Sequence, residues 1–168
     1  LMALHALRPM LEAWAESNDA TLHIVCSQEA SREEHWGKLK VCVFPWSEER
    51  LRKSAAIARL AIVPAKRRLK LSWLKPASRI RCLYAQGVPA IGDGRAPDVA
   101  AFTRPFNGPR ARGVREWRAQ LDRLWNDPAE LQRLATAGHA EVRNHGTTRN
   151  TARKWIRHLA KNDCLSPR

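Results

Sequence analysis

The sequence has no apolar run of about eighteen residues, which excludes a transmembrane helix. It also has few cysteines, and these are spaced neither as C-x-x-C pairs nor with histidines at zinc-finger distances, which excludes a zinc finger. They are Cys26, Cys42, Cys82 and Cys164. Because Cys26 and Cys42 lie in apolar strand patterns, we expect them to be buried thiols. A reducing, cytoplasmic location fits this usage best.

Several catalytic motifs are also missing. The chain contains no Walker-type loop, no Gly-x-Ser-x-Gly elbow, no Gly-x-Gly-x-x-Gly and no Asp-x-Asp. His139 and His145 stand six positions apart with no carboxylate at ligand spacing, and Asp93 and Asp98 only flank Gly and Pro in a loop. We therefore predict no metal site and no bound cofactor, and the catalytic residues stay unassigned.

Acidic residues are scarce. The chain has sixteen Asp and Glu residues and thirty Lys and Arg residues, which gives a net charge of +14. Such an excess implies an anionic partner, namely nucleic acid, a membrane surface or a phosphorylated ligand. An arginine-rich composition without functional meaning is a further explanation. The 168 residues are enough for one hydrophobic core. The N-terminal segment is too acidic at its end for a signal peptide. Because the sequence starts with Leu and with a helix already under way, we expect a piece of a longer chain.

Hydrophobic periodicity predicts strands that alternate with helices. Helices are expected over 2–17, 47–59 (capped by Ser47), 78–86, 97–102, 114–125, from 128 (capped by Asp127), and 150–161. Strands are expected over 21–27, 40–46, 60–64 and 88–92, with a short helix or loop over 28–39. This alternation predicts an α/β fold: a Rossmann-like parallel sheet with helices on both faces, followed by C-terminal helices. We assign residues 1–112 to the α/β core and 113–168 to a helical segment packing on the same domain.

The stretch from Leu60 to Gly92 carries the strongest functional signal. It reads strand, basic loop, helix, strand, and it holds seven basic residues and no acidic one between Lys66 and Arg81. The free amides and the dipole of a helix N-terminus favour an anion. We therefore predict that Lys75, Ser78 and Arg79 bind phosphate, and that the loop cations Lys66, Arg67, Arg68 and Lys70 form a rim without direct contact.

FPWSEERLRKSAAIARLAIVP followed by KPASRIRCLYAQGVPAIG resembles the donor-binding half of GT-B-fold glycosyltransferases. Gly87, Val88 and Pro89 match the family's Gly-x-Pro turn, and Lys75, Ser78 and Arg79 match its K-x-x-N-R-like signature. The segment EWRAQLDRLWNDPAELQRLATAGHAEV is similar to the family's helix, Asp-Pro, helix ending. The resemblance covers roughly residues 1–161. It implies metal-independent transfer of a sugar from a nucleoside diphosphate to an acceptor.

The sequence also departs from that family. Many retaining members carry two glutamates eight positions apart, and those places hold Leu74 and Cys82 here. The Gly-rich strand and loop that come before the first helix, and the N-terminal acceptor-binding domain, are missing from these residues. The resemblance therefore implies a chain that is inactive, or nearly so, by itself.

The donor's base and ribose need a second set of contacts. In such folds the turn after a strand's carboxyl end receives the base. We therefore assign Phe44 and Trp46 to the base and ribose, and the resemblance adds Cys82, which stands at one of the family's glutamate positions. Packing of Trp46 against a helix is the simpler alternative, and Trp14, Trp117, Trp125 and Trp155 are expected in the core or at a domain interface.

A basic nucleic-acid-binding domain is the alternative function. The region from Arg143 to Lys161 has six Lys or Arg residues and no acidic one, and Trp155 could stack on bases. In the structural alternative, Trp155, Ile156 and Leu159 are buried. A third possibility keeps the transferase activity and uses the excess charge to hold the protein at the inner, anionic face of a membrane.

Overall fold

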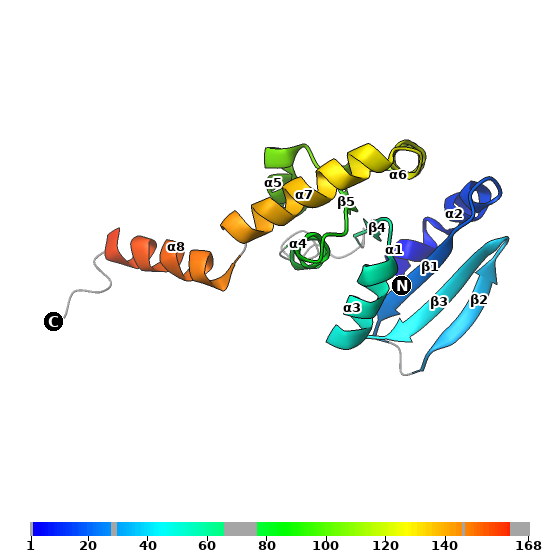
Figure 1. Cartoon of the computed structure of the whole chain (residues 1–168), viewed down its shortest axis with the longest axis horizontal. Helices are drawn as coiled ribbons and strands as arrows, with labels where there is room; N and C mark the ends of the chain where they lie inside the picture. The colour runs from blue at the N-terminus through cyan, green and yellow to red at the C-terminus, as the bar shows by residue number, and fades with distance from the viewer. Residues whose placement is uncertain (1, 28–29, 66–76, 146, 162–168) are drawn as a thin grey trace.

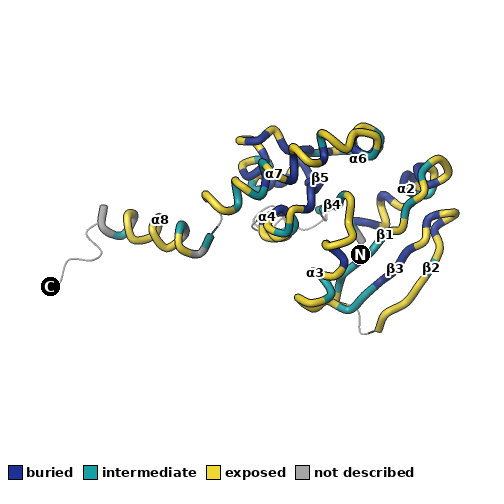
Figure 2. Tube along the Cα trace, in the orientation of Figure 1, coloured by how far each residue is buried: buried dark blue, intermediate teal, exposed yellow. Residues whose placement is uncertain are grey.

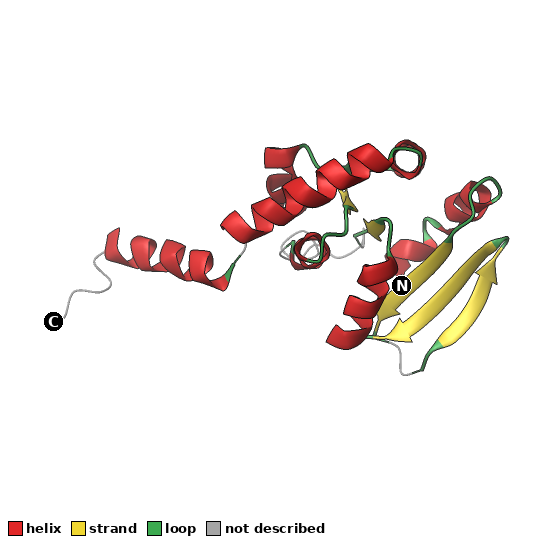
Figure 3. Cartoon of the chain, in the orientation of Figure 1, coloured by secondary structure: helices red, strands yellow, loops and turns green. Residues whose placement is uncertain are grey.

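The computed structural model describes residues 2–27, 30–65, 77–145 and 147–161 (Figure 1). Within these ranges the chain is a mixed α/β protein (Figure 3). Its strands are β1 (Thr21–Cys26), β2 (Arg32–Trp36), β3 (Leu39–Pro45), β4 (Ala61–Val63), β5 (Ala90–Asp93) and β6 (Arg110–Ala111). Its helices are α1 (Met2–His5), α2 (Arg8–Ala15), α3 (Glu48–Ile57), α4 (Ser78–Ala85), α5 (Pro97–Thr103), the 3-10 turn η2 (Arg104–Phe106), α6 (Val114–Trp125), α7 (Pro128–His145) and α8 (Thr148–Lys161).

The described strands form two sheets of three strands each. Sheet A has the order β1-β3-β2, with β1 parallel to β3 and β2 antiparallel to it. Sheet B has the order β4-β5-β6 and is parallel throughout. The prediction of an α/β fold with parallel strands is confirmed, but the prediction of one parallel sheet is corrected to a mixed sheet and a parallel one.

Strand β2 replaces the short helix or loop that we expected within 28–39. It joins β3 through a two-residue turn at Gly37 and Lys38, across which Trp36 pairs with Leu39. Gly37 has φ of +58°, which suits the first central position of a tight hairpin turn. The strand was missed because four of its five residues are polar, and only Trp36 is buried.

The expected helix over 2–17 is divided into α1 and α2. Pro9 lies in the first turn of α2. Proline has no N–H and its ring would clash with the carbonyl of His5 in a continuous helix, so the chain must break between the two segments.

Other boundaries are confirmed. The Ser47 hydroxyl accepts a hydrogen bond from Arg50 N–H at 3.0 Å and caps α3. Gly87, with φ of +76°, ends α4; Gly87 N–H donates to Tyr84 O and Val88 N–H to Leu83 O, which satisfies the last carbonyls of the helix.

A hydrophobic core includes residues from Leu4 to Leu134 and from both sheets (Figure 2). Trp14 and Trp117 are buried in it as expected, and Trp125 is partly buried and meets Trp14 edge-to-face at 4.9 Å. Trp155 does not lie in the core, since it is 62% exposed on α8. Cys42 is buried as predicted, Cys26 is only partly buried, and both are free thiols.

Candidate anion site at the carboxyl edge of sheet B

The site that we consider lies where the three parallel strands of sheet B end. Helices α5 and α6 follow directly from the carboxyl ends of β5 and β6. Helix α4 runs antiparallel to β5, because Ile80 in its first turn faces Gly92 while the Tyr84 hydroxyl in its last turn donates to Ala90 O at 3.2 Å. The N-termini of α4, α5 and α6 therefore gather at one edge, and each carries a partial positive charge.

Helix α4 differs from the other two in its first turn. Asp98 lies in the first turn of α5 and Glu116 in that of α6, so each of those helix ends holds its own carboxylate. The first turn of α4 has no acidic residue, and its N-cap, Ala77, has no side chain that can accept a hydrogen bond. No carboxylate in its own first turn therefore offsets the dipole of α4, which favours an anion at this helix end.

Arg79 adds a full positive charge to this helix end. It stands in the first turn of α4 and is exposed. It has no ion pair with any carboxylate in the described part of the chain. Ser78, at the first helical position, is also exposed. The structure thus brings together two of the three residues predicted to bind phosphate.

Asp93 ties together two backbone segments at this edge, the one that follows β4 and the one that follows β5. Its side chain is buried at the carboxyl end of β5, and its two oxygens accept hydrogen bonds from Ala65 N–H at 3.3 Å and Arg95 N–H at 3.0 Å. Ala65 is the last described residue before the basic loop, so Asp93 anchors the point from which that loop departs. The sequence offered one signal for this role, an Asp between two glycines directly after an apolar strand.

Gly94 follows Asp93 directly, and the side chains of Arg110 and Arg112 from the β6 region lie beside it. A Cβ added at Gly94 would lie 3.1 Å from the Arg112 side chain and 3.4 Å from that of Arg110. Arg95 and Arg112 are exposed, and neither has an ion-pair partner among the described residues. With Arg79 they place three guanidinium groups at this edge, beside the carboxylates of Asp93, Asp98 and Glu116. The sequence did not single out Arg112, because its approach to Gly94 depends on the pairing of β5 with β6.

The position of α4 is set by its buried face. Tyr84 is fully buried and contacts the rings of Phe102 and Phe106. Burial raises the pKa of Tyr84 to about 12. Gly92 lets the helix approach closely, since a Cβ there would lie 2.9 Å from Ile80 Cδ1. This packing holds the N-terminus of α4 in place against β5.

The residues predicted to bind the base do not form one group. Cys82 is exposed on α4, one turn from Arg79, and accepts a hydrogen bond from the Gln86 amide. Phe44 and Trp46 instead lie at the end of β3 in sheet A.

Phe44 and Trp46 also differ from each other. The Arg50 guanidinium lies 4.4 Å from the centre of the Phe44 ring, and His23 packs against the same ring edge-to-face, so Phe44 already has partners. Trp46 is 65% exposed, which contradicts packing against a helix and leaves its ring accessible.

Other predicted residues lie outside the described residues. These are Lys75, the loop cations Lys66, Arg67, Arg68 and Lys70, the position Leu74 and the cysteine Cys164.

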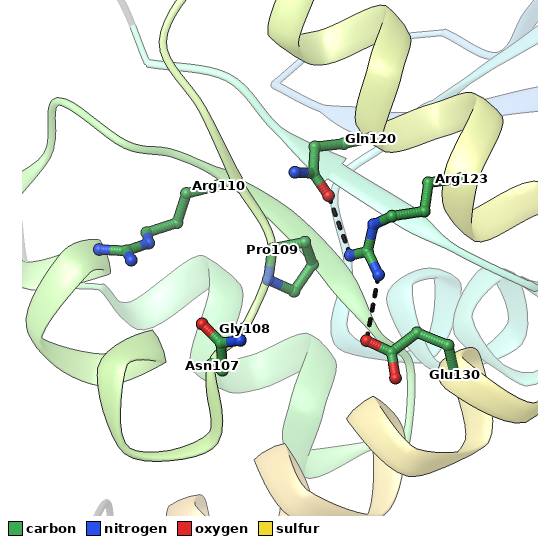
Figure 4. Close-up of a pocket in the computed structure, with 7 residues that line it drawn as sticks. All are labelled: Asn107, Gly108, Pro109, Arg110, Gln120, Arg123 and Glu130. Atoms are coloured by element: carbon green, nitrogen blue, oxygen red, sulfur yellow. Dashed lines mark hydrogen bonds and ion pairs between the residues drawn. The ribbon is translucent and has the colours of Figure 1, made fainter.

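A shallow hollow of about 300 Å³ lies at the opposite edge of sheet B (Figure 4). It borders Asn107, Gly108 and Pro109, which precede β6, and its wall includes Arg123 and Glu130. The Glu130 carboxylate accepts hydrogen bonds from Arg123 and Arg133, and these arginines, Arg133 first, lower its pKa to about 2. Arg123 and Glu130 thus satisfy each other, and we do not assign this hollow a ligand.

Within the described ranges, no three His, Cys, Asp or Glu residues lie close enough together to hold a metal ion. None of the described helices combines the length and the apolar character that crossing a membrane requires. Comparison with protein families, curated proteins and solved structures finds no match for this chain.

Proposed function

We propose that this chain is the donor-binding half of a GT-B-fold, nucleotide-sugar-dependent glycosyltransferase. The observation that carries the proposal is the N-terminus of α4 at the carboxyl edge of a parallel sheet, with Arg79 in its first turn and no acidic residue there. This is the arrangement in which α/β proteins bind phosphate groups.

The order of the strands also supports a Rossmann-like domain. Doubly wound sheets of this class have the parallel order 3-2-1-4-5-6. The antiparallel strand β2 has no counterpart in that order. Without it, sheet A consists of β3 and β1, which correspond to places 3 and 2. Sheet B consists of β4, β5 and β6, which correspond to places 4, 5 and 6. Place 1 is that of the Gly-rich strand that the resemblance to glycosyltransferases puts before the first helix. We propose that a strand from outside residues 1–168 occupies it and joins the sheets.

The apolar residues of the two flanking strands fit this proposal. Leu22 and Val25 of β1 and Ile62 and Val63 of β4 are only partly buried. In a completed parallel sheet such residues are normally covered. Their present exposure is therefore what a missing central strand would leave.

The chemistry follows from the charges at the edge. Breaking the bond between the anomeric carbon and the diphosphate builds negative charge on the departing phosphate oxygens, and fixed positive groups lower that barrier. The amides of the first turn of α4 and the guanidinium of Arg79 would bind this diphosphate, with Lys75 proposed beside them. Trp46 and Cys82 stay our candidates for the base and ribose. Phe44 would act through Arg50 and His23, by supporting the end of β3.

Calorimetric titration of the purified chain with UDP, GDP and ADP tests the proposal. We expect one diphosphate to bind saturably and the affinity to fall only mildly as salt is raised. Arg79→Ala and Lys75→Ala should each weaken binding by about 1.5–3 kcal/mol, the range for hydrogen bonds to charged groups. Arg104→Ala is the matched control, because Arg104 is exposed but precedes β6 at the opposite edge.

Unchanged affinity in both variants, or equal losses in the Arg104 control, would refute the site. A single-stranded oligonucleotide titrated in parallel tests the alternative function. Tight oligonucleotide binding that collapses with salt, without diphosphate binding, would replace the transferase with a nucleic-acid-binding domain.

A further inference from the structure

Helix α8 extends from the body of the protein and touches it near its own N-terminus (Figure 1). The junction is built from defined hydrogen bonds. The Thr147 hydroxyl accepts from Asn150 N–H at 3.2 Å and caps the helix, and the Asn150 amide donates to the carbonyls of Arg143 and Asn144 at the end of α7. The helix therefore has a fixed start on α7, and its later turns lie away from the core.

The apolar side chains of α8 are uncovered. Trp155 and Ile156 are 62% and 59% exposed, and Leu159 is partly exposed. At about 100° per residue, Trp155 and Leu159 lie about 40° apart, with Ile156 beside them, so they form one stripe. Burial of these residues in the core, the structural alternative considered above, is wrong for this chain.

The opposite side of α8 is basic. Arg149, Arg153 and Arg157 recur at four-residue intervals and are all exposed. Arg153 lies about 200° from Trp155 around the helix axis. The sequence of α8 has five Lys or Arg residues and no Asp or Glu. None of the three exposed arginines forms an ion pair with another described residue.

We infer that α8 is an interfacial helix that binds an anionic lipid membrane. An apolar stripe with tryptophan, opposite a face that is rich in arginine and has no acidic residue, is the pattern of helices that lie in the plane of a bilayer surface. Anionic headgroups attract basic residues along the whole cationic face, whereas the apolar side chains enter the boundary with the acyl chains. A protein partner that covered only the apolar stripe would not contact the arginines on the other side of α8. Binding to an anionic membrane accounts for both the apolar and the basic residues.

Sedimentation of the whole chain with lipid vesicles tests this inference. Vesicles of phosphatidylcholine mixed with the anionic lipid phosphatidylglycerol are compared with vesicles of phosphatidylcholine alone. We expect binding to the anionic vesicles only, and weaker binding as salt is raised.

Two paired variants separate the contributions of charge and apolar contact. Arg153→Gln with Arg157→Gln should weaken binding about 30-fold, since each basic residue near such a surface contributes about a factor of five. Trp155→Ser with Ile156→Ser should weaken it at least about tenfold. Ile57→Ser and Arg52→Gln on α3 are matched controls, because both residues are exposed and lie outside α8. Far-ultraviolet circular dichroism checks that every variant keeps its helices.

Equal binding to both kinds of vesicle, or wild-type binding by both α8 variants, would overturn the inference. If the α8 variants instead lose binding to a single-stranded oligonucleotide and keep binding to vesicles, α8 is a nucleic-acid contact and the membrane role is refuted. None of these results depends on diphosphate binding, so they are independent of the proposed transferase function.

Discussion

Gly138, in the middle of α7, should be irreplaceable because of Tyr84. A Cβ built on Gly138 would lie 2.5 Å from Cε1 and 2.7 Å from Cγ of the Tyr84 ring, far inside normal contact. The ring is fully buried between Phe102 and Phe106 and is held by its hydroxyl on Ala90 O. It cannot move aside without disturbing α4, which positions the candidate anion site.

The change in the free energy of unfolding caused by Gly138→Ala is the sum of opposing effects. Alanine would favour the helix by about 1 kcal/mol over glycine. Overpacking of a filled core costs about 1–3 kcal/mol, and loss of the Tyr84 hydrogen bond about 1 kcal/mol more. We therefore expect the free energy of unfolding to fall by about 1–3 kcal/mol, the opposite sign to that of helix propensity alone.

Urea unfolding followed by circular dichroism measures this difference. Ala140→Gly, at an exposed position of the same helix, calibrates the effect of propensity in α7. In a Tyr84→Leu background the clash is removed, so Gly138→Ala should become neutral or stabilising. A Gly138→Ala protein at least as stable as the wild type would refute the packing argument.

Two further predictions use titrating groups. Tyr84 is the only tyrosine of the chain, so its absorbance at alkaline pH should titrate near the raised pKa of about 12 in the folded protein and near 10 once unfolded. The stability that its neutral form provides is therefore complete below pH 10 and lost as the pH rises towards 12; a native midpoint near 10 would contradict the burial of the phenol. The lowered pKa of Glu130, about 2, implies stability that is present above about pH 4.5 and lost as the pH falls towards 2. Glu130→Gln should lower the unfolding free energy by about 1 kcal/mol at pH 7, because solvent screens part of the pairing, and this difference should shrink to zero between those pH values. Urea titrations at pH 7, 4 and 2.5 check it, and a constant difference would exclude the ion pairs as its cause.

Features that depend on neighbouring residues in the chain could be predicted from the sequence. Ser47 caps α3, Gly87 ends α4, and Asp127 accepts a hydrogen bond from Glu130 N–H at the start of α7. Each of these signals acts within about four residues, where the side chain and the backbone that it contacts are fixed by local geometry.

Features that depend on strand pairing could not be predicted. β2 is polar apart from Trp36, and only its pairing with β3 makes it a strand. The role of Asp93 needs β4 beside β5, and the approach of Arg112 to Gly94 needs β6 beside β5. For the candidate site, the sequence therefore identified the helix end and Arg79 but not the groups that anchor and surround it.

The distribution of charge gives a joint test of both proposals against an arginine-rich composition without function. Many basic residues of the described chain are paired, as in Arg8 with Glu12 and Lys53 with Glu49. Arg79 at the edge of sheet B, and Arg153 and Arg157 on α8, have no such partner in the described ranges. If charge alone attracted anions, removing arginines from either surface would weaken diphosphate and vesicle binding alike. Specific sites predict a separation instead: Arg79→Ala should reduce only diphosphate binding, and Arg153→Gln with Arg157→Gln only vesicle binding. Parallel losses in both assays would refute the assignment of separate sites and reduce both surfaces to parts of one diffuse positive field.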